Sequence, residues 1–127
     1  MREIRIETNF NSKLNSELFM HISFAPIAPA IHESELQEPV KIIVLDGSHE
    51  PIICRVADLA RCRLIELRTL DTWMSHGLMN NDFEEWWLQK YPQCDAGTEM
   101  GIYIYKKLTD QEINALPAER QKELFAA

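Results

Sequence analysis

Apolar and polar residues alternate with a period of two along much of this chain, which is typical of β-strands with one buried face. In the last such segment Met100, Ile102 and Ile104 alternate with glycine and tyrosine. The continuous apolar run at 40–45 instead predicts a strand inside a sheet, and an Asp-Gly turn ends it. The segment 61–67 is either a separate strand or a bent extension of the one before it. The predicted strands are 2–7, 19–24, 40–45, 51–56, 61–67 and 98–107.

Spacings of three and four between apolar residues predict short helices between these strands. The best-defined helix spans 80–92, because polar residues precede it and Pro92 ends it. Its candidate N-caps are Asn80, Asn81 and Asp82. Its apolar face carries four aromatic rings that we expect to anchor the core, those of Phe83, Trp86, Trp87 and Tyr91. Further helices are predicted at 10–18 and 69–77, and Thr109 opens a helical tail with a capping box.

These elements predict an α+β fold of about five to six mostly antiparallel strands with flanking short helices. A chain of 127 residues with 46% hydrophobic residues suits one domain with its own core. We assign this domain to 1–108 and a C-terminal helical tail to 109–127. The stretch 25–39 contains prolines that cannot continue a central strand, so we expect an acidic loop that either lids a cleft or carries an interface.

Composition excludes several classes of protein. The net charge of −7 at pH 7 argues against a protein that coats nucleic acid through bulk electrostatics. Three cysteines without a Cys-x-x-Cys pair disfavour a disulfide framework or a zinc knuckle. His32, His49 and His76 fall in predicted loops without metal-ligand spacing, so neither a metal nor a cofactor is predicted. No apolar run matches a membrane span or a signal peptide, and we expect a cytoplasmic protein.

Charge is unevenly distributed along the chain. Residues 55–68 hold four arginines against two acidic residues, a local balance of +2, and this basic strip could hold phosphates or stack on bases. Residues 32–50 hold five acidic residues against one lysine, a balance of −4. Residues 69–99 hold six against one, a balance of −5. The acidic stretches could instead face a basic partner protein.

The order of elements in the second half of the chain forms a recognisable pattern. A hairpin leads into the segment Glu66–Asp71, a short helix ending at Gly77, the aromatic helix ending in Tyr-Pro, and the strand Gly101–Tyr105. Over residues 40–107 this order resembles the ASCH domain of the PUA-like superfamily, with a weaker match before it. The resemblance implies a small β-barrel flanked by helices and a function linked to RNA. Members of the family include small bacterial acetylcytidine amidohydrolases.

ASCH proteins carry a Gly-x-Lys-x-x-Thr-x-Arg signature at the junction between the first helix and the following strand. When this signature is aligned with the chain, the positions of its Gly, Lys, Thr and Arg are occupied by Ser16, Leu18, His21 and Ser23. Leucine cannot act as a base or nucleophile, and the stretch 75–80, where the family's acidic catalytic residue would fall, has no carboxylate. Lys13 enters only in a shifted register and would then lie inside the preceding helix. The resemblance therefore implies a binding module without catalytic residues.

The candidate ligand contacts are His21, Ser23, Arg55, Arg63 and Trp73. Each also has a structural interpretation. A lone histidine on a strand such as His21 is more often hydrogen-bonded to its neighbours than part of a site. Arginines that alternate along a strand, such as Arg61 and Arg63, are also typical of the exposed face of a sheet. Trp73 is a possible stacking platform, but its spacing also fits a core position beside Leu70.

Three functional hypotheses follow from these residues and the resemblance. The leading hypothesis is an ASCH-like module that binds RNA, a nucleotide or a modified nucleoside without the family's amidohydrolase activity. The alternative is a small acidic interaction or inhibitor protein, of phage or mobile-element type, that uses the barrel as a scaffold for binding a basic protein. The third is a diverged nucleoside amidohydrolase with rearranged catalytic groups.

Overall fold

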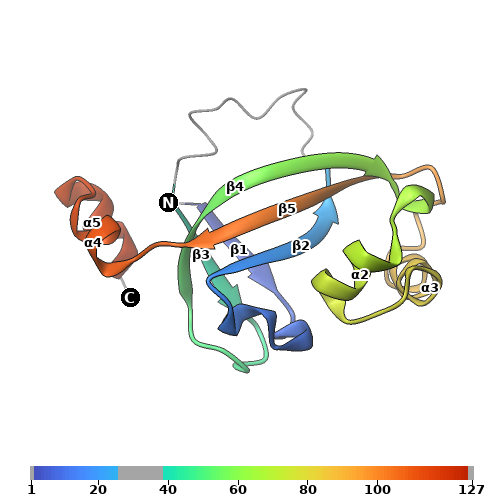
Figure 1. Cartoon of the computed structure of the whole chain (residues 1–127), viewed down its shortest axis with the longest axis horizontal. Coiled ribbons are helices and arrows are strands. Elements are labelled where there is room, and N and C mark those ends of the chain that lie inside the picture. Colours follow the sequence, from blue (N-terminus) through green and yellow to red (C-terminus); the bar gives the residue numbers. More distant parts are fainter. Residues whose placement is uncertain (1, 26–38, 126–127) are drawn as a thin grey trace.

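Five strands form one mixed sheet in this computed structural model, which describes residues 2–25 and 39–125 (Figure 1). The strands are β1 (Arg2–Ile6), β2 (Leu18–Phe24), β3 (Pro39–Val44), β4 (Ile52–Arg63) and β5 (Glu99–Lys107). Their order across the sheet is β1-β3-β4-β5-β2. β1 runs parallel to β3, and the other neighbouring pairs are antiparallel. The predicted loop at 25–39 lies, apart from its two end residues, outside the described part of the chain.

The sheet confirms the α+β class, but the prediction of a closed β-barrel is wrong. Within the described residues β1 and β2 are the two edges of the sheet and do not pair with each other. The outer edge of β2 meets a helix instead, because the Ile22 amide donates a 2.7 Å hydrogen bond to the hydroxyl oxygen of Ser75. This edge amide of β2 thus has its acceptor in a helix and not in a further strand. The sheet therefore stays open along a seam between β1 and β2.

β4 is a single long strand with one irregularity. The segment predicted at 51–56 and residues 61–63 belong to this one strand, which continues in the same direction. The rest of the strand predicted at 61–67 is wrong, because Leu64–Glu66 form a 3-10 helix. Val56 faces Tyr105 and Asp58 faces Ile104, so β4 has one more residue than β5 at this point, as in a β-bulge. Because side chains alternate between faces, the extra residue exchanges the faces to which odd- and even-numbered side chains of β4 point.

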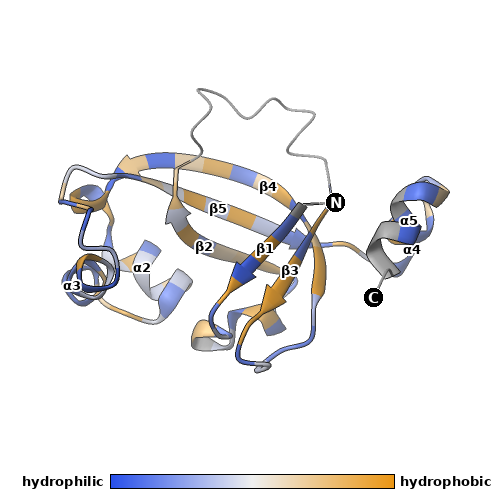
Figure 2. Ribbon diagram, turned by 180° about the vertical axis from the view of Figure 1, so that it is seen from behind, coloured by the Kyte–Doolittle hydropathy of each residue, from blue (hydrophilic) through white to orange (hydrophobic). Residues whose placement is uncertain are grey.

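Each face of the sheet has its own hydrophobic core. The first core lies where the curved sheet faces itself, and its buried residues include Ile6, Phe19, Val40, Ile42, Val56 and Tyr105. The second core joins the other face to the helices, and its buried residues are Ile22, Leu64, Leu67, Phe83, Trp87 and Met100. Figure 2 shows β3 as largely hydrophobic, which agrees with its predicted place in the interior of the sheet.

The helical segments are η1 (Phe10–Asn15), η2 (Leu64–Glu66), α2 (Thr69–His76), α3 (Asn80–Lys90), α4 (Asp110–Asn114) and α5 (Ala118–Phe125). The helix predicted at 10–18 is the 3-10 helix η1, which ends three residues before β2 begins. α2 ends, as expected, at Gly77 in the left-handed conformation. The predicted N-caps of α3 are wrong, because the cap residue is Met79 and its side chain makes no capping hydrogen bond.

α2 buries polar side chains and exposes apolar ones, the reverse of an ordinary amphipathic helix. Its buried residues are Asp71, Thr72, Ser75 and His76. Leu70 is 64% exposed and Trp73 is 49% exposed, so the core position considered for Trp73 is wrong. The polar inner face of α2 lies along β2, where it supplies hydrogen-bonding groups to the seam.

The C-terminal tail begins at the predicted capping box, in which the Glu112 amide donates a 3.1 Å hydrogen bond to the Thr109 hydroxyl. Pro117 separates α4 from α5, and both helices lie at the end of the sheet away from α2 and α3 (Figure 1). In the described ranges, none of the helices has the length and apolar character needed to cross a membrane.

Candidate functional site

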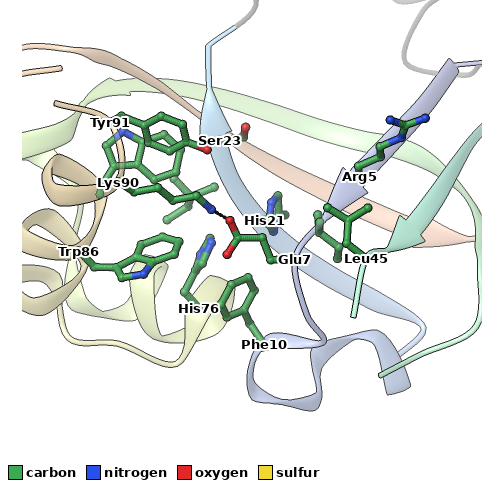
Figure 3. Close-up of a pocket in the computed structure, with 13 residues that line it drawn as sticks. Arg5, Glu7, Phe10, His21, Ser23, Leu45, His76, Trp86, Lys90 and Tyr91 are labelled. Carbon is green, nitrogen blue, oxygen red and sulfur yellow. Dashed lines mark ion pairs between the residues drawn. The ribbon is translucent and has the colours of Figure 1, made fainter. Parts of the chain in front are cut away.

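Two adjoining cavities open at the seam between β1 and β2, and both are lined by Arg5, His21 and Ser23. The first, which we call the seam cavity, has a volume of about 220 Å³. Its lining also includes Glu7, Phe10, His76, Trp86, Lys90 and Tyr91 (Figure 3). The second, which we call the tyrosine cavity, has a volume of about 240 Å³ and is completed by Ile4, Tyr103 and Tyr105. The place where the sheet fails to close is thus lined by two cavities.

A buried lysine lies directly behind the wall of the seam cavity. Lys13 is only 7% exposed, and its Nζ lies 2.6 Å from Nδ1 of His21 and 2.6 Å from the carbonyl oxygen of Ser75. Within the described residues no carboxylate forms a salt bridge with this amine. Burying an amine without an opposite charge costs free energy, so Lys13 is hard to explain as a stabilising residue.

The backbone beside Lys13 is also strained. Ser12 has a φ of 53°, in the left-handed region that residues other than glycine seldom occupy. Such a conformation costs about 1–2 kcal/mol and persists only where the surroundings impose it. Strain next to a buried amine is a further sign that this segment serves a site.

Ser75 holds the polar groups of the site together. Its hydroxyl oxygen accepts the Ile22 amide and lies 2.7 Å from Nδ1 of His76, while its carbonyl oxygen accepts from Lys13. Ser75 is completely buried. One serine of α2 therefore connects β2, the lysine of η1 and a second histidine.

The His76 ring is enclosed by other rings. Its centroid lies 5.1 Å from that of His21, which it stacks against, and 4.4 Å from that of Phe10. The Phe83 and Trp86 rings lie at 5.0 Å and 5.3 Å. Contacts on several sides leave this ring little freedom to rotate.

Burial sets the protonation states of the site. It lowers the pKa of Lys13 from the ordinary value of 10.5 to about 7. Burial, assisted by the positive charge of Lys13, lowers the pKa of His76 from 6.5 to about 3. The pKa of His21 lies well below its ordinary value through burial and the charges of Lys13 and His76. Near pH 7 both histidines are neutral, and Lys13 is close to the midpoint of its titration.

An ion pair lies across the seam cavity. The Lys90 ammonium pairs with the Glu7 carboxylate, which connects the end of α3 to the segment after β1 (Figure 3). Lys90 also lies over the Trp86 ring, 4.9 Å from its centroid, and over the Tyr91 ring at 5.5 Å. Partial burial lowers the pKa of Lys90. A ligand that enters the cavity would meet these paired charges and the exposed part of the indole ring.

The structure brings together two of the five candidate contacts. His21 and Ser23 both line the two cavities. Arg55 lies opposite Lys106 and Arg63 opposite Glu99, eight residues or roughly 26 Å apart along β4. The bulge between them turns their side chains to opposite faces, and Arg63 forms a 3.1 Å ion pair with Glu66. Arg55, Arg63 and Trp73 do not line either cavity.

Sequence reasoning missed the buried residues of the site. The prediction that Lys13 lies inside the first helix is confirmed by η1, but its side chain points inward and its amine reaches His21. The loop expected for His76 is wrong, because this residue lies within the helix predicted at 69–77, as the last residue of α2, and is 6% exposed. The sequence shows that α2 has a polar and an apolar face, but not that the polar face with Ser75 and His76 is the buried one.

No group of three or more His, Cys, Asp and Glu side chains in the described ranges is placed to hold a metal ion. Comparison with protein-family models, with curated proteins and with solved structures finds no match to this chain. The geometry of the seam is therefore the basis on which a function can be proposed.

We predict that replacing Lys13 with methionine changes how stability depends on pH. The unfolded chain binds a proton at Lys13 up to pH 10.5, but the folded chain releases it near pH 7. The wild-type free energy of unfolding should therefore rise between these two values, by on the order of a few kcal/mol.

In Lys13→Met this rise should disappear, and the variant should be the more stable protein at neutral pH. Denaturant unfolding of both proteins from pH 6 to pH 10 measures the difference, which removes contributions from groups common to the two. Parallel curves for the two proteins would show that Lys13 is not buried as described.

Proposed function

We propose that this chain is an ASCH-like module that binds a nucleoside-type ligand, free or as one residue of RNA, in the seam cavity. The observation that carries the proposal is the lining of that cavity. Phe10, Trp86 and Tyr91 present rings against which a planar base can stack, and neutral histidines and Ser23 supply hydrogen bonds. Base recognition in single-stranded nucleic acid commonly combines these two kinds of contact.

The size of the cavity favours a small ligand. Its volume of about 220 Å³ lies below the roughly 300–1,000 Å³ that is usual for a drug-sized molecule. The adjoining tyrosine cavity shares three lining residues with it and could hold the rest of a nucleoside. A net charge of −7 and the scattered arginines disfavour a long stretch of phosphate backbone.

The resemblance to ASCH domains supports the same place on the molecule. His21 and Ser23, which occupy signature positions in that alignment, both line the cavity. The signature lysine is absent at Leu18, but Lys13 brings an amine to within 2.6 Å of His21 from a different segment. We propose that this chain is an ASCH-like domain whose sheet is open and whose cavity lies at the seam between β1 and β2.

The proposal predicts that Trp86 and Trp73 behave differently. Both indoles are partly exposed, but only Trp86 lines the cavity. Because base stacking contributes about 1–3 kcal/mol, Trp86→Leu should weaken binding of nucleosides by about tenfold or more. Trp73→Leu should leave the affinity unchanged.

Calorimetric titration with cytidine, uridine, N4-acetylcytidine and short single-stranded RNAs at low salt measures these affinities. Equal losses in the two variants, or no binding by the wild-type protein to any of these compounds, would contradict the proposal.

The second candidate function is a nucleoside amidohydrolase, and the observation that favours it is the pairing of Lys13 with His21. In such a reaction water adds to the acyl carbonyl carbon, the carbon–nitrogen bond breaks, and a carboxylic acid and a free amine leave. His21 would take a proton from the water and pass one from Nδ1 to the neutral Lys13 amine, and the leaving nitrogen would receive a proton when Lys13 returns it through His21. A lysine with a pKa of about 7 suits this task, since general bases work best near the operating pH.

For this second candidate we predict release of acetate from N4-acetylcytidine, with kcat/KM rising with pH through about 7 as Lys13 loses its proton. Lys13→Met should abolish most of kcat, whereas Lys90→Met, at the other side of the cavity, should mainly change KM. Chromatographic measurement of both products tests it. Absence of acetate release, or full activity in Lys13→Met, would leave binding as the function.

A further inference from the structure

His76 is held in a single orientation and a single protonation state beside the cavity. The rings of Phe10, His21, Phe83 and Trp86 surround it at centroid distances between 4.4 and 5.3 Å. Its place at the C-terminus of α2 would ordinarily favour the charged form. Burial outweighs this effect, because the pKa lies near 3 and the ring is neutral under physiological conditions.

Ser75 determines which nitrogen of His76 carries the proton. The Ser75 hydroxyl oxygen already accepts the Ile22 amide, and its oxygen lies 2.7 Å from Nδ1 of His76. If Nδ1 donated this hydrogen bond, the Ser75 hydroxyl would accept it and could not use Nδ1 as an acceptor for its own hydrogen. Such a loss is unfavourable in a completely buried side chain. The hydroxyl therefore donates to Nδ1, and a neutral ring must then carry its proton on Nε2.

His76 lines the seam cavity, and its Nε2 atom is the nitrogen considered for contact with a ligand there. Within the described ranges, the one buried side-chain nitrogen or oxygen without a hydrogen-bond partner is the indole nitrogen of Trp87. Among the described residues the hydrogen bond of His76 is made through Nδ1, to a serine outside the cavity lining, so Nε2 is the ring nitrogen that is left for a ligand. Figure 3 shows the His76 ring between Phe10 and Trp86, among the residues that line the cavity.

We infer that His76 is the specificity-determining residue of the seam cavity, and that its Nε2–H selects ligands carrying an oxo group over those carrying an amino group at the same position. This inference rests on the proposed function, because it concerns the ligand bound there. An oxo group accepts the hydrogen bond, whereas an amino group would place two donors against each other. His21 cannot impose such a choice, because Lys13 can either donate to its Nδ1 or, when neutral, accept from it.

Two measurements test the assignment. Long-range ¹H–¹⁵N NMR of the wild-type protein reports the tautomer of each histidine, and we expect His76 to carry its proton on Nε2 with no ligand present. Affinities for two matched pairs, uridine against cytidine and inosine against adenosine, report selectivity. We expect the oxo member of the pair that fits the cavity to bind at least about tenfold more tightly.

Three variants distinguish the effect of the Nε2–H donor from the effect of the imidazole ring of His76. His76→Gln keeps a side-chain N–H near the position of Nε2 and should keep the preference for the oxo compound. His76→Leu should lose the preference. Ser75→Ala should lose part of it while keeping the histidine, and its NMR spectrum should show both tautomers of His76. Trp73→Leu, on the outer face of α2, is the matched control and should keep the wild-type preference.

The outcomes distinguish this inference from the proposed function. Nucleoside binding without any oxo preference, or a His76 proton found on Nδ1, overturns the assignment and leaves the proposed function standing. Absence of binding to all four nucleosides overturns the proposed function, and with it the ligand class assigned here. A preference that survives in His76→Leu would also overturn the assignment, because another group must then make the selection.

Discussion

The hydrogen bond from the Ile22 amide to the Ser75 hydroxyl joins the fold of this protein to its candidate site. Because β2 is an edge strand, its outward amides need acceptors that no neighbouring strand supplies. α2 supplies one by turning a serine inward, and the helix must then bury polar residues where a helix normally buries apolar ones. The same serine directs its hydroxyl to His76 and its carbonyl to Lys13. The same serine therefore completes the edge of the sheet and positions the polar groups of the site.

Lys13 shows why this arrangement is better explained by function than by stability. Its amine is buried with only neutral partners, and the lowered pKa measures how unfavourable the charged form is there. A leucine or methionine would fill the same space without that cost. Groups with strongly shifted pKa values beside a cavity are typical of binding and catalytic sites. Here the shift occurs beside two neutral histidines and within reach of aromatic rings.

Most strands and helices could be predicted from the sequence because local periodicity encodes them, although Leu64–Glu66 form η2 where a strand was predicted. The alternation of Met100, Ile102 and Ile104 predicts the last strand, and Gly77 predicts the end of α2. The open edge of the sheet could not be predicted in this way. Whether β1 pairs with β2 depends on what covers Ile22, and the residue that does so is 53 positions further along the chain.

The candidate site was only partly predictable for the same reason. His21 and Ser23 follow from their position after the first helix, and both reach the cavity. Arg55 and Arg63 have the same parity in the sequence, but a single extra residue in β4 sends them to opposite faces. Lys13 and Ser75 are 62 positions apart and meet only in the folded chain. No spacing rule covers such a contact.

The most direct test of this account is the pKa of the Lys13 side chain, measured by ¹⁵N-detected NMR titration of selectively labelled lysine and assigned with Lys13→Met. Since Nζ is buried between His21 and the carbonyl of Ser75, we expect a midpoint near 7. A midpoint near the ordinary 10.5 would mean that the amine is solvated, and would contradict the site described here.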